Sequence, residues 1–173
     1  MHQEVSELVP LNIAVLTVSD TRTEQSDHSG NYLKEVIQKD KHIFTDKKIV
    51  KDDKYQIRAV LSEWIFSPQV EVIIITGGTG FSGRDTTPEA VLPLLDKEMP
   101  GFGELFRNVS FEEISTSTIQ SRALAGYANF TLIFCLPGST HACETGWEKI
   151  IKSQLDARFK PCNFVSLVKR RYA

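Results

Sequence analysis

The chain has 173 residues, 41% of them hydrophobic and 24% charged, which suits one globular domain with a full core. A net charge of −2 argues against a protein that binds nucleic acid by bulk electrostatics. There is no run near the roughly 20 apolar residues of a membrane span, no apolar signal core at the start, and no metal spacing among the three cysteines. We therefore expect a cytoplasmic protein without nucleic-acid or membrane partners. We also expect a single domain over 1–173, with loose tails at 1–10 and 165–173.

Strand and helix patterns alternate along the chain. Apolar runs predict strands at 11–18, 43–50, 70–75 and 130–136. Helical spacing of apolar residues predicts helices over 30–39, after Asp53 and up to Pro68, over 121–128, and from Cys143 to Leu155. A helix should also run from Pro88 toward Asp96, with a bend at Pro93, and a short helix should begin at Gly101. Residues 110–119 are rich in Ser and Thr and receive no assignment. The alternation predicts an α/β fold, with an open, mostly parallel sheet covered by helices on both faces.

The segment 70–80 is the most informative part of the chain. Five of its first six residues are Val or Ile, which is typical of a strand buried on both faces. The strand runs into small polar residues, namely Thr76, Gly77, Gly78, Thr79 and Gly80. Open α/β sheets bind ligands at such strand ends. Because glycine exposes backbone N–H groups and threonine adds hydroxyl donors, the sequence predicts an anion-binding loop here.

Two other interpretations of the glycines are weaker. Residues 78–83 match the dinucleotide pattern G-x-G-x-x-G, but the helix signals come only near Thr87 and no acidic strand end follows at the expected distance. The same residues resemble a P-loop without its Lys and its Ser or Thr, so we reject that interpretation. A tight turn would explain one or two of the glycines.

Three predicted strands end in small polar residues. The strand ending near Val18 leads into Ser19, and the strand ending near Leu136 leads into Pro137, Gly138 and Ser139. If these strands and the one before the glycine loop are parallel, their ends line one crevice. The Pro137–Ser139 loop precedes a helix and could form a second anion site, although an ordinary turn would have the same composition.

Acidic residues stand close to the predicted loops. Asp85 is either the cap of the next helix or a functional acid beside the anion loop. Asp52 and Asp53 both precede a helix, and at least one of them should be its cap. At a strand end, Asp52 would face Asp85 across the crevice. Two carboxylates beside a phosphate cradle are what Mg²⁺-assisted phosphoryl chemistry requires.

Two further features have less specific interpretations. His141 lies near the second loop, and we expect it at the surface, since the histidines show no metal spacing. Phe102, Leu105 and Phe106 share one helical face, which could be core or a contact between subunits.

The combined motifs resemble the molybdopterin-binding family. They are the Thr76–Gly80 loop, the run from Arg84 to Ala90, the Gly101–Glu104 segment and the Pro137–Ser139 loop, and the resemblance covers nearly the whole chain. It implies a three-layer α/β sandwich that assembles as homotrimers or pairs of trimers (hexamers). It also implies binding of molybdopterin, a pterin dithiolene with a terminal phosphate. In the adenylyltransferase members, molybdopterin is joined to AMP that comes from ATP, with Mg²⁺.

Carried over by residue, the resemblance makes both loops and Ser19 binding elements for pterin and nucleotide. It makes Asp52 and Asp85 the two acids tied to Mg²⁺ and adenylyl transfer. The chain departs from adenylyltransferase relatives at Lys51 and at Ser139-Thr140, where Pro and Asn-Pro are frequent. The sequence thus predicts a protein of molybdenum cofactor biosynthesis that adenylylates molybdopterin. The alternative is a non-catalytic molybdopterin carrier with the same pocket.

Overall fold

The computed structural model describes residues 7–170. The strands are β1 (Asn12–Val18), β2 (Ile43–Val50), β3 (Val72–Thr76), β4 (Lys97–Glu98), β5 (Leu124–Ala128) and β6 (Thr131–Leu136). The α-helices are α1 (His28–Lys39), α2 (Lys54–Phe66), α3 (Thr87–Val91), α4 (Pro100–Ile114), α5 (Thr140–Gly146), α6 (Lys152–Gln154) and α7 (Val165–Lys169). Two 3-10 helices, η1 (Leu92–Leu94) and η2 (Ser115–Gln120), and a π-helical stretch, η3 (Trp147–Ile151), complete the described elements.

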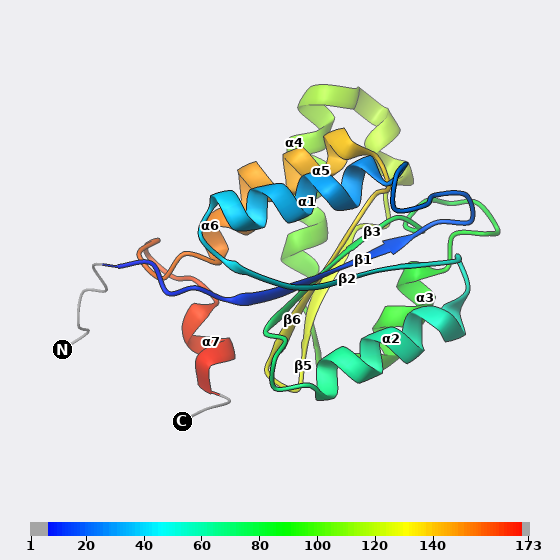
Figure 1. The fold of residues 1–173 in the computed structure, drawn as a ribbon. Helices are drawn as coiled ribbons and strands as arrows, with labels where there is room; N and C mark the ends of the chain where they lie inside the picture. The colour runs from blue at the N-terminus through cyan, green and yellow to red at the C-terminus, as the bar shows by residue number, and fades with distance from the viewer. Residues whose placement is uncertain (1–6, 171–173) are drawn as a thin grey trace.

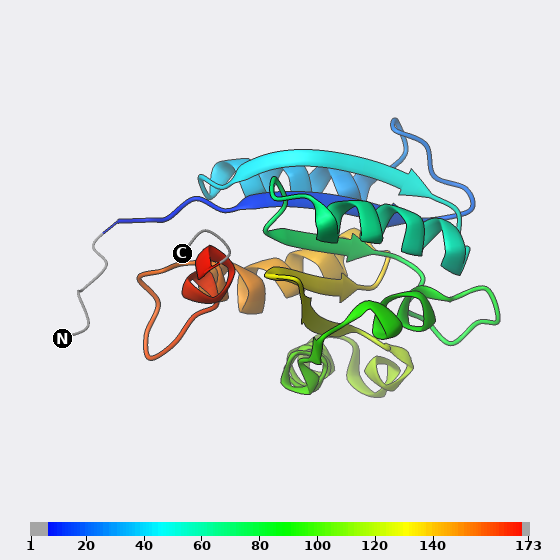
Figure 2. The ribbon, with the colours of Figure 1, turned by 90° about the horizontal axis from the view of Figure 1, so that it is seen from below.

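The strands form one six-stranded sheet in the order β2-β1-β3-β6-β5-β4. Neighbouring strands from β2 to β6 are parallel, whereas β5 is antiparallel to both β6 and β4. Helices α1, α4 and α5 lie on one side of the sheet and α2 and α3 on the other (Figures 1 and 2). The predicted three-layer, mostly parallel α/β architecture is therefore confirmed.

The order of the strands creates a crevice between β1 and β3. From β1 the chain passes through α1 to β2 on one side, and it then returns through α2 to β3 on the other side. The loops after β1 and β3 therefore leave the sheet in different directions at its carboxyl edge. Such a switch point is where open α/β sheets bind ligands.

Apolar side chains fill both faces of the central strands. Along β3, Val72 and Ile74 belong to the core under α1, α4 and α5, and Ile73 and Ile75 belong to the core under α2 and α3. All four are fully buried, which explains why this strand has Val or Ile at each of these positions. Within residues 7–170, no helix is both long and apolar enough to cross a membrane.

The prediction of a helix over 121–128 is wrong. Leu124–Ala128 is the strand β5, which pairs in antiparallel register with β6. The two strands are joined by Asn129 and Phe130, which have φ values of 45° and 64°. Positive φ at both central residues is the signature of a type I′ hairpin turn, whose twist matches that of the flanking strands. The pairing with β6 overrides the weak helical spacing of this short, alanine-containing segment.

The helices around residues 88–114 differ from the prediction in length. The helix that begins at Thr87 ends at Val91, and Pro93 lies in the 3-10 turn that follows, where a missing N–H is tolerated. The helix predicted to be short at Gly101 extends from Pro100 to Ile114.

The apolar face of α4 belongs mainly to the core of its own chain. Phe102 and Phe106 are only 4% and 2% exposed, and the Phe102 ring lies 5.2 Å from the ring of Phe134. Leu105 is 45% exposed. A subunit contact made by Phe102 and Phe106 is therefore ruled out by their burial inside the chain.

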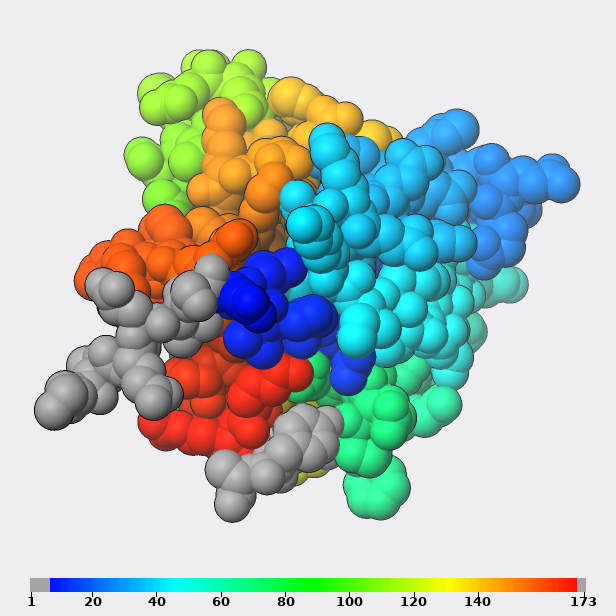
Figure 3. All heavy atoms as spheres, turned by 60° about the vertical axis from the view of Figure 1, so that its left-hand side comes forward, coloured from blue at the N-terminus to red at the C-terminus, as the bar shows by residue number. Residues whose placement is uncertain are grey.

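The prediction of a loose tail from residue 165 is also wrong for the described part of that tail. Residues Val165–Lys169 form α7, whose Val165 and Val168 are buried in the core. Figure 3 shows this helix packed directly beside the N-terminal segment. The Lys169 ammonium lies 2.7 Å from the Glu71 carboxylate, which is itself 1% exposed. Residues 1–6 and 171–173 of the expected tails lie outside the described residues.

Candidate functional site

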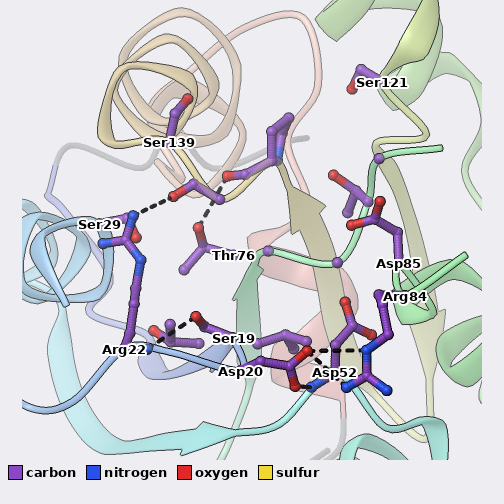
Figure 4. A pocket seen from close by; sticks show the side chains of 18 of the residues that line it. Ser19, Asp20, Arg22, Ser29, Asp52, Thr76, Arg84, Asp85, Ser121 and Ser139 are labelled. Carbon is purple, nitrogen blue, oxygen red and sulfur yellow. Dashed lines mark hydrogen bonds and ion pairs between the residues drawn. The ribbon is translucent and has the colours of Figure 1, made fainter. Parts of the chain in front are cut away.

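A pocket of about 670 Å³ opens at the carboxyl edge of the sheet, at the switch point between β1 and β3. Its walls come from the loops after β1, β3 and β6, together with η2 (Figure 4). Every residue that the sequence predicted for the site lines this pocket: Ser19, Asp52, Thr76, Gly77, Gly78, Thr79, Gly80, Asp85, Pro137, Gly138 and Ser139. The expected convergence of three strand ends in one crevice is confirmed, and the binding roles of these residues stay predictions.

The glycine loop turns sharply out of β3. Gly77 and Gly78 have φ values of 105° and 65°, in the left-handed region that favours glycine. A Cβ atom on Gly77 would lie 2.1 Å from the backbone oxygen of Val18. The loop is tied to the loop after β6, because the Thr76 hydroxyl donates to the Pro137 oxygen at 3.0 Å. The two predicted anion loops therefore form one connected backbone surface.

Thr79 carries a buried hydroxyl without a partner. The residue is 2% exposed, and among residues 7–170 its Oγ1 finds no hydrogen-bond partner. A buried polar group left unpaired costs about 1–3 kcal/mol. Because Thr79 lines the pocket, an acceptor on a bound ligand would satisfy this hydroxyl.

The neighbouring acids Asp52 and Asp53 have different surroundings. Asp53 caps α2, since its carboxylate accepts hydrogen bonds from the N–H groups of Tyr55 and Gln56. Asp52 is 9% exposed and lines the pocket. Its Oδ1 accepts hydrogen bonds from the backbone N–H of Thr86 at 2.9 Å and from the Thr86 hydroxyl at 2.7 Å. The expectation that at least one of the pair caps the helix is confirmed for Asp53.

Asp85 is not the cap of α3, because the capping position belongs to Thr86. The Asp85 carboxylate instead accepts a hydrogen bond from the backbone N–H of Ser82 at 2.7 Å and closes the turn between them. A Cβ atom on Gly80 would lie 2.8 Å from the Asp85 Oδ2. Asp85 therefore borders the glycine loop from the pocket side.

Asp52 and Asp85 each have one carboxylate oxygen that is free to bind a ligand. The Asp52 and Asp85 hydrogen bonds fall on one oxygen each, Oδ1 and Oδ2 respectively, and the second oxygen receives none from the described residues. Residues 7–170 contain no group of three His, Cys, Asp or Glu side chains able to hold a metal ion. Mg²⁺ is usually bound by one or two carboxylates together with substrate phosphates, so the donor set fits Mg²⁺ completed by a phosphorylated ligand.

The second loop leads into α5. The Ser139 hydroxyl caps this helix by accepting a hydrogen bond from the backbone N–H of Ala142 at 3.2 Å. His141, two residues further on, has a side chain that is 63% exposed and lies 3.1 Å from the Glu113 carboxylate. It does not line the pocket. The expected surface position of His141 is confirmed.

Two arginines, one in the pocket and one behind its glycine loop, were not selected from the sequence. Arg22 lines the pocket beside the second loop, where it donates to the Gly138 oxygen at 3.3 Å. Arg122 donates to the oxygens of Gly80 and Asp85, both at 2.7 Å, and pairs with Glu89. Arg22 follows Ser19 by three residues, which is a weak signal, whereas nothing near Arg122 in the sequence indicates its role.

Two charged pairs lie at the pocket, Arg84 with Asp20 and Lys47 with Asp27. The Arg84 guanidinium, 2.7 Å from the Asp20 carboxylate, lowers the pKa of Asp20. Beneath the floor, burial raises the pKa of Asp27, but hydrogen bonds from Lys47, the Gly30 N–H and Thr17 outweigh it, so the net shift is downward. Thr17, which lines the pocket, is thus held by a charged Asp27.

The fold and the pocket together define a class of protein. It is a three-layer α/β protein with a glycine loop, a second loop and two carboxylates at the switch point of its sheet. Known proteins identify the class more closely. The model of a family described as a probable molybdopterin binding domain matches residues 14–157.

Individual relatives are similar over nearly their full length. The chain is 58% identical over 164 residues to molybdenum cofactor biosynthesis protein B of Escherichia coli K12, a match that covers 95% of this chain and 96% of the relative. A crystal structure of a molybdenum cofactor biosynthesis protein B superimposes with a TM-score of 0.86 at 36% identity, covering 96% and 98% of the two chains. The tungsten cofactor synthesizing protein MoaB from Pyrococcus furiosus matches with a TM-score of 0.78 at 38% identity, covering 94% and 98%. The chain belongs to the molybdopterin-binding domain family.

Proposed function

We propose that this protein acts in molybdenum cofactor biosynthesis, binds molybdopterin in the pocket at the switch point, and adenylylates it with Mg-ATP. Membership of the molybdopterin-binding domain family supports the ligand. The observation that carries the proposal is the meeting of both loops and both acids in one pocket of about 670 Å³. A pocket of that size suits a small organic ligand.

The backbone of the glycine loop supplies the binding surface. Gly77 and Gly78 turn the chain sharply at the end of β3. The Gly77 N–H donates to the Leu136 oxygen at 3.0 Å, whereas the N–H groups of Gly78, Thr79 and Gly80 donate to no described residue. The buried Thr79 hydroxyl adds a donor that no described residue uses. These groups suit a ligand with phosphate oxygens, because hydrogen bonds to a charged acceptor are about twice as strong as neutral ones.

Adenylyl transfer requires no nucleophile from the protein. The terminal phosphate oxygen of molybdopterin would form a bond to the α-phosphorus of ATP while the bond from that phosphorus to the bridging oxygen breaks and pyrophosphate leaves. Asp52 and Asp85 would hold Mg²⁺, which neutralises charge on the phosphates. The protein then contributes positioning, with Thr86 orienting the Asp52 carboxylate and Ser82 orienting the Asp85 carboxylate.

The proposed location is the cytoplasm. Cys135, Cys143 and Cys162 are all free thiols in the structure, which suits a reducing compartment. Burial raises the pKa of Cys143 to about 12, so this thiol, although it lies behind the second loop, is not a nucleophile.

The direct test is to mix the protein with molybdopterin, ATP and Mg²⁺ and to look for adenylylated molybdopterin and pyrophosphate. Asp85→Asn and Asp52→Asn should reduce the rate of turnover by about 100-fold or more and affect molybdopterin affinity much less. Asn keeps the oxygen that accepts hydrogen bonds from Ser82 or Thr86 and removes the charge.

Asp53→Asn is the matched control, because it is the same change one residue away. Asn caps helices as well as Asp does, and Asp53 does not line the pocket, so its turnover should equal that of the wild type. If wild-type protein binds molybdopterin and forms no product, the pocket belongs to a non-catalytic carrier. If it binds no molybdopterin, the proposed function fails altogether.

A further inference from the structure

The charges that line the pocket are unevenly distributed. Asp20, Arg22, Asp52, Arg84 and Asp85 are its charged residues. Arg84 is neutralised by Asp20, at 2.7 Å. Arg22 makes no ion pair with any of the described residues, so it is the cation of the pocket whose charge has no partner there.

The Arg22 side chain is partly free to bind. Its Nη1 donates to the Ser26 oxygen at 3.2 Å and its Nη2 to the Gly138 oxygen at 3.3 Å. A guanidinium has five N–H donors, and only neutral carbonyl oxygens among residues 7–170 accept from this one. These two bonds hold the side chain over the second loop without compensating its charge.

Two serine hydroxyls near Arg22 are also available as donors. The Ser19 Oγ accepts hydrogen bonds from the N–H groups of Thr21 and Arg22, and the Ser139 Oγ accepts one from the N–H of Ala142. Within the described residues, neither hydroxyl donates its own proton. Both therefore can donate to an anion in the pocket.

We infer that Arg22, with Ser19 and Ser139, binds a phosphoryl group of the ligand at one end of the pocket. Figure 4 shows Arg22 and Ser139 well separated from Asp52 and Asp85. The end of the pocket with Arg22 can therefore bind an anion directly. The end with Asp52 and Asp85 can bind an anion only when a cation such as Mg²⁺ lies between them. A planar guanidinium matches the paired oxygens of a phosphate, which makes arginine suited to this role.

This inference rests on the proposed function for the identity of the ligand, and it specifies how the ligand is oriented. The phosphoryl group can belong to molybdopterin or to ATP, because both carry the same chemistry. Asp52 and Asp85 then face the phosphates of molybdopterin or ATP that bind Mg²⁺. A ligand bound in the opposite direction would place a phosphate without Mg²⁺ beside two carboxylates, which is unfavourable.

The test compares full-length wild type, Arg22→Met and Arg22→Lys by equilibrium titration with molybdopterin, dephosphorylated molybdopterin, ATP and adenosine. Arg22→Met should weaken binding of one phosphorylated ligand by about 10- to 100-fold, and the affinity for its unphosphorylated counterpart should not change. Arg22→Lys keeps the charge without the planar fork and should show an intermediate loss. The ligand that loses affinity identifies the source of the phosphoryl group.

The controls separate this inference from the proposed function. Arg158→Met removes an exposed arginine that pairs with Asp156 outside the pocket, and it should bind as the wild type does.

Arg22→Met protein that binds both phosphorylated ligands as tightly as the wild type overturns the role of Arg22 and leaves the proposed function standing. If the wild type binds neither ligand, the proposed function fails, and inorganic phosphate becomes the probe. If phosphate raises the melting temperature of the wild type and not that of Arg22→Met, the anion site is supported. If phosphate does not stabilise the wild type, the anion site is overturned.

Discussion

At the scale of single residues, Gly78 combines two constraints. Its φ is 65°, and an added Cβ would lie 2.3 Å from the Thr87 hydroxyl and 2.7 Å from Asp52 Oδ2. Gly78→Ala should therefore lower the free energy of unfolding by about 1–3 kcal/mol and also displace the Asp52 carboxylate. Urea denaturation measures the first effect and ligand titration the second. Gly83→Ala, in the same loop with nothing within 4 Å of its Cβ position, should behave like the wild type. Equal stability of the two variants would contradict this account.

Asp27 gives the stability of the protein a pH dependence. It is fully buried and lies 2.9 Å from the Lys47 ammonium, and its pKa in the folded protein is lowered from an ordinary value of 3.8. A lowered carboxyl pKa contributes stability that is present above pH 3.8 and is lost as the pH falls through the folded pKa. The free energy of unfolding of the wild type should thus fall steeply below about pH 4.

Asp27→Asn isolates this contribution. At pH 7 it should cost about 3 kcal/mol, because it leaves the buried end of Lys47 with the exposed Glu24 as its only charged partner, beside the Asn31 amide oxygen. Its stability should also vary less between pH 5 and pH 3 than that of the wild type, as measured by denaturant titration at each pH. A parallel pH dependence in both proteins would show that other carboxylates are responsible.

At the scale of elements, Arg122 joins the start of β5 to the loop that carries Asp85. It donates to the oxygens of Gly80 and Asp85 and pairs with Glu89 on α3, so one side chain holds both ends of the loop. Each such charge-assisted hydrogen bond is worth about 1.5–3 kcal/mol. Arg122→Ala should therefore increase the population of the open loop about tenfold or more. The rate of trypsin cleavage after the exposed Arg84 should rise by the same factor.

Mass spectrometry of the digests identifies the cleavage site. Arg158→Ala, which removes only a local pair with Asp156, is the control and should leave the rate of cleavage at Arg84 unchanged. An Arg122→Ala protein that resists trypsin as well as the wild type would show that the loop is held by its own turn contacts.

At the scale of the whole molecule, assembly as a trimer or a pair of trimers is a prediction that rests on the family resemblance. The structure moves the candidate contact away from Phe102, whose ring is buried in its own chain, toward exposed apolar side chains of α4 and η2. Leu105, Phe111, Ile114 and Ile119 are between 45% and 74% exposed. Apolar groups left uncovered together on one chain frequently mark interfaces.

Light scattering at low micromolar concentration should therefore give a mass three or six times 19.5 kDa. Phe111→Asp should keep the circular dichroism spectrum and reduce the mass, whereas Phe102→Asp should unfold the chain. A wild-type mass of 19.5 kDa would contradict assembly. An unchanged oligomer of Phe111→Asp would place the interface elsewhere.

The sequence by itself determined the parts of the fold that depend on local pattern. The Val/Ile run of β3 could be recognised because both of its faces are buried, and the glycine loop because φ values such as those of Gly77 and Gly78 favour glycine. The carboxylates of Asp52 and Asp85 were identified from their places beside a strand end and a helix start. These signals are encoded within a few residues of chain.

Only the tertiary structure decided the rest. Leu124–Ala128 is a strand because β6 pairs with it, and Phe102 is core because Phe134 meets it from another element. Arg122 reaches a loop about 40 residues away in the chain, as its bond to Gly80 shows. Arg22 gains its significance from the absence of an acidic partner among the described residues around it. Contacts between distant segments leave no periodicity or spacing in the sequence, so the residues that hold and orient the site appear only when the chain is folded.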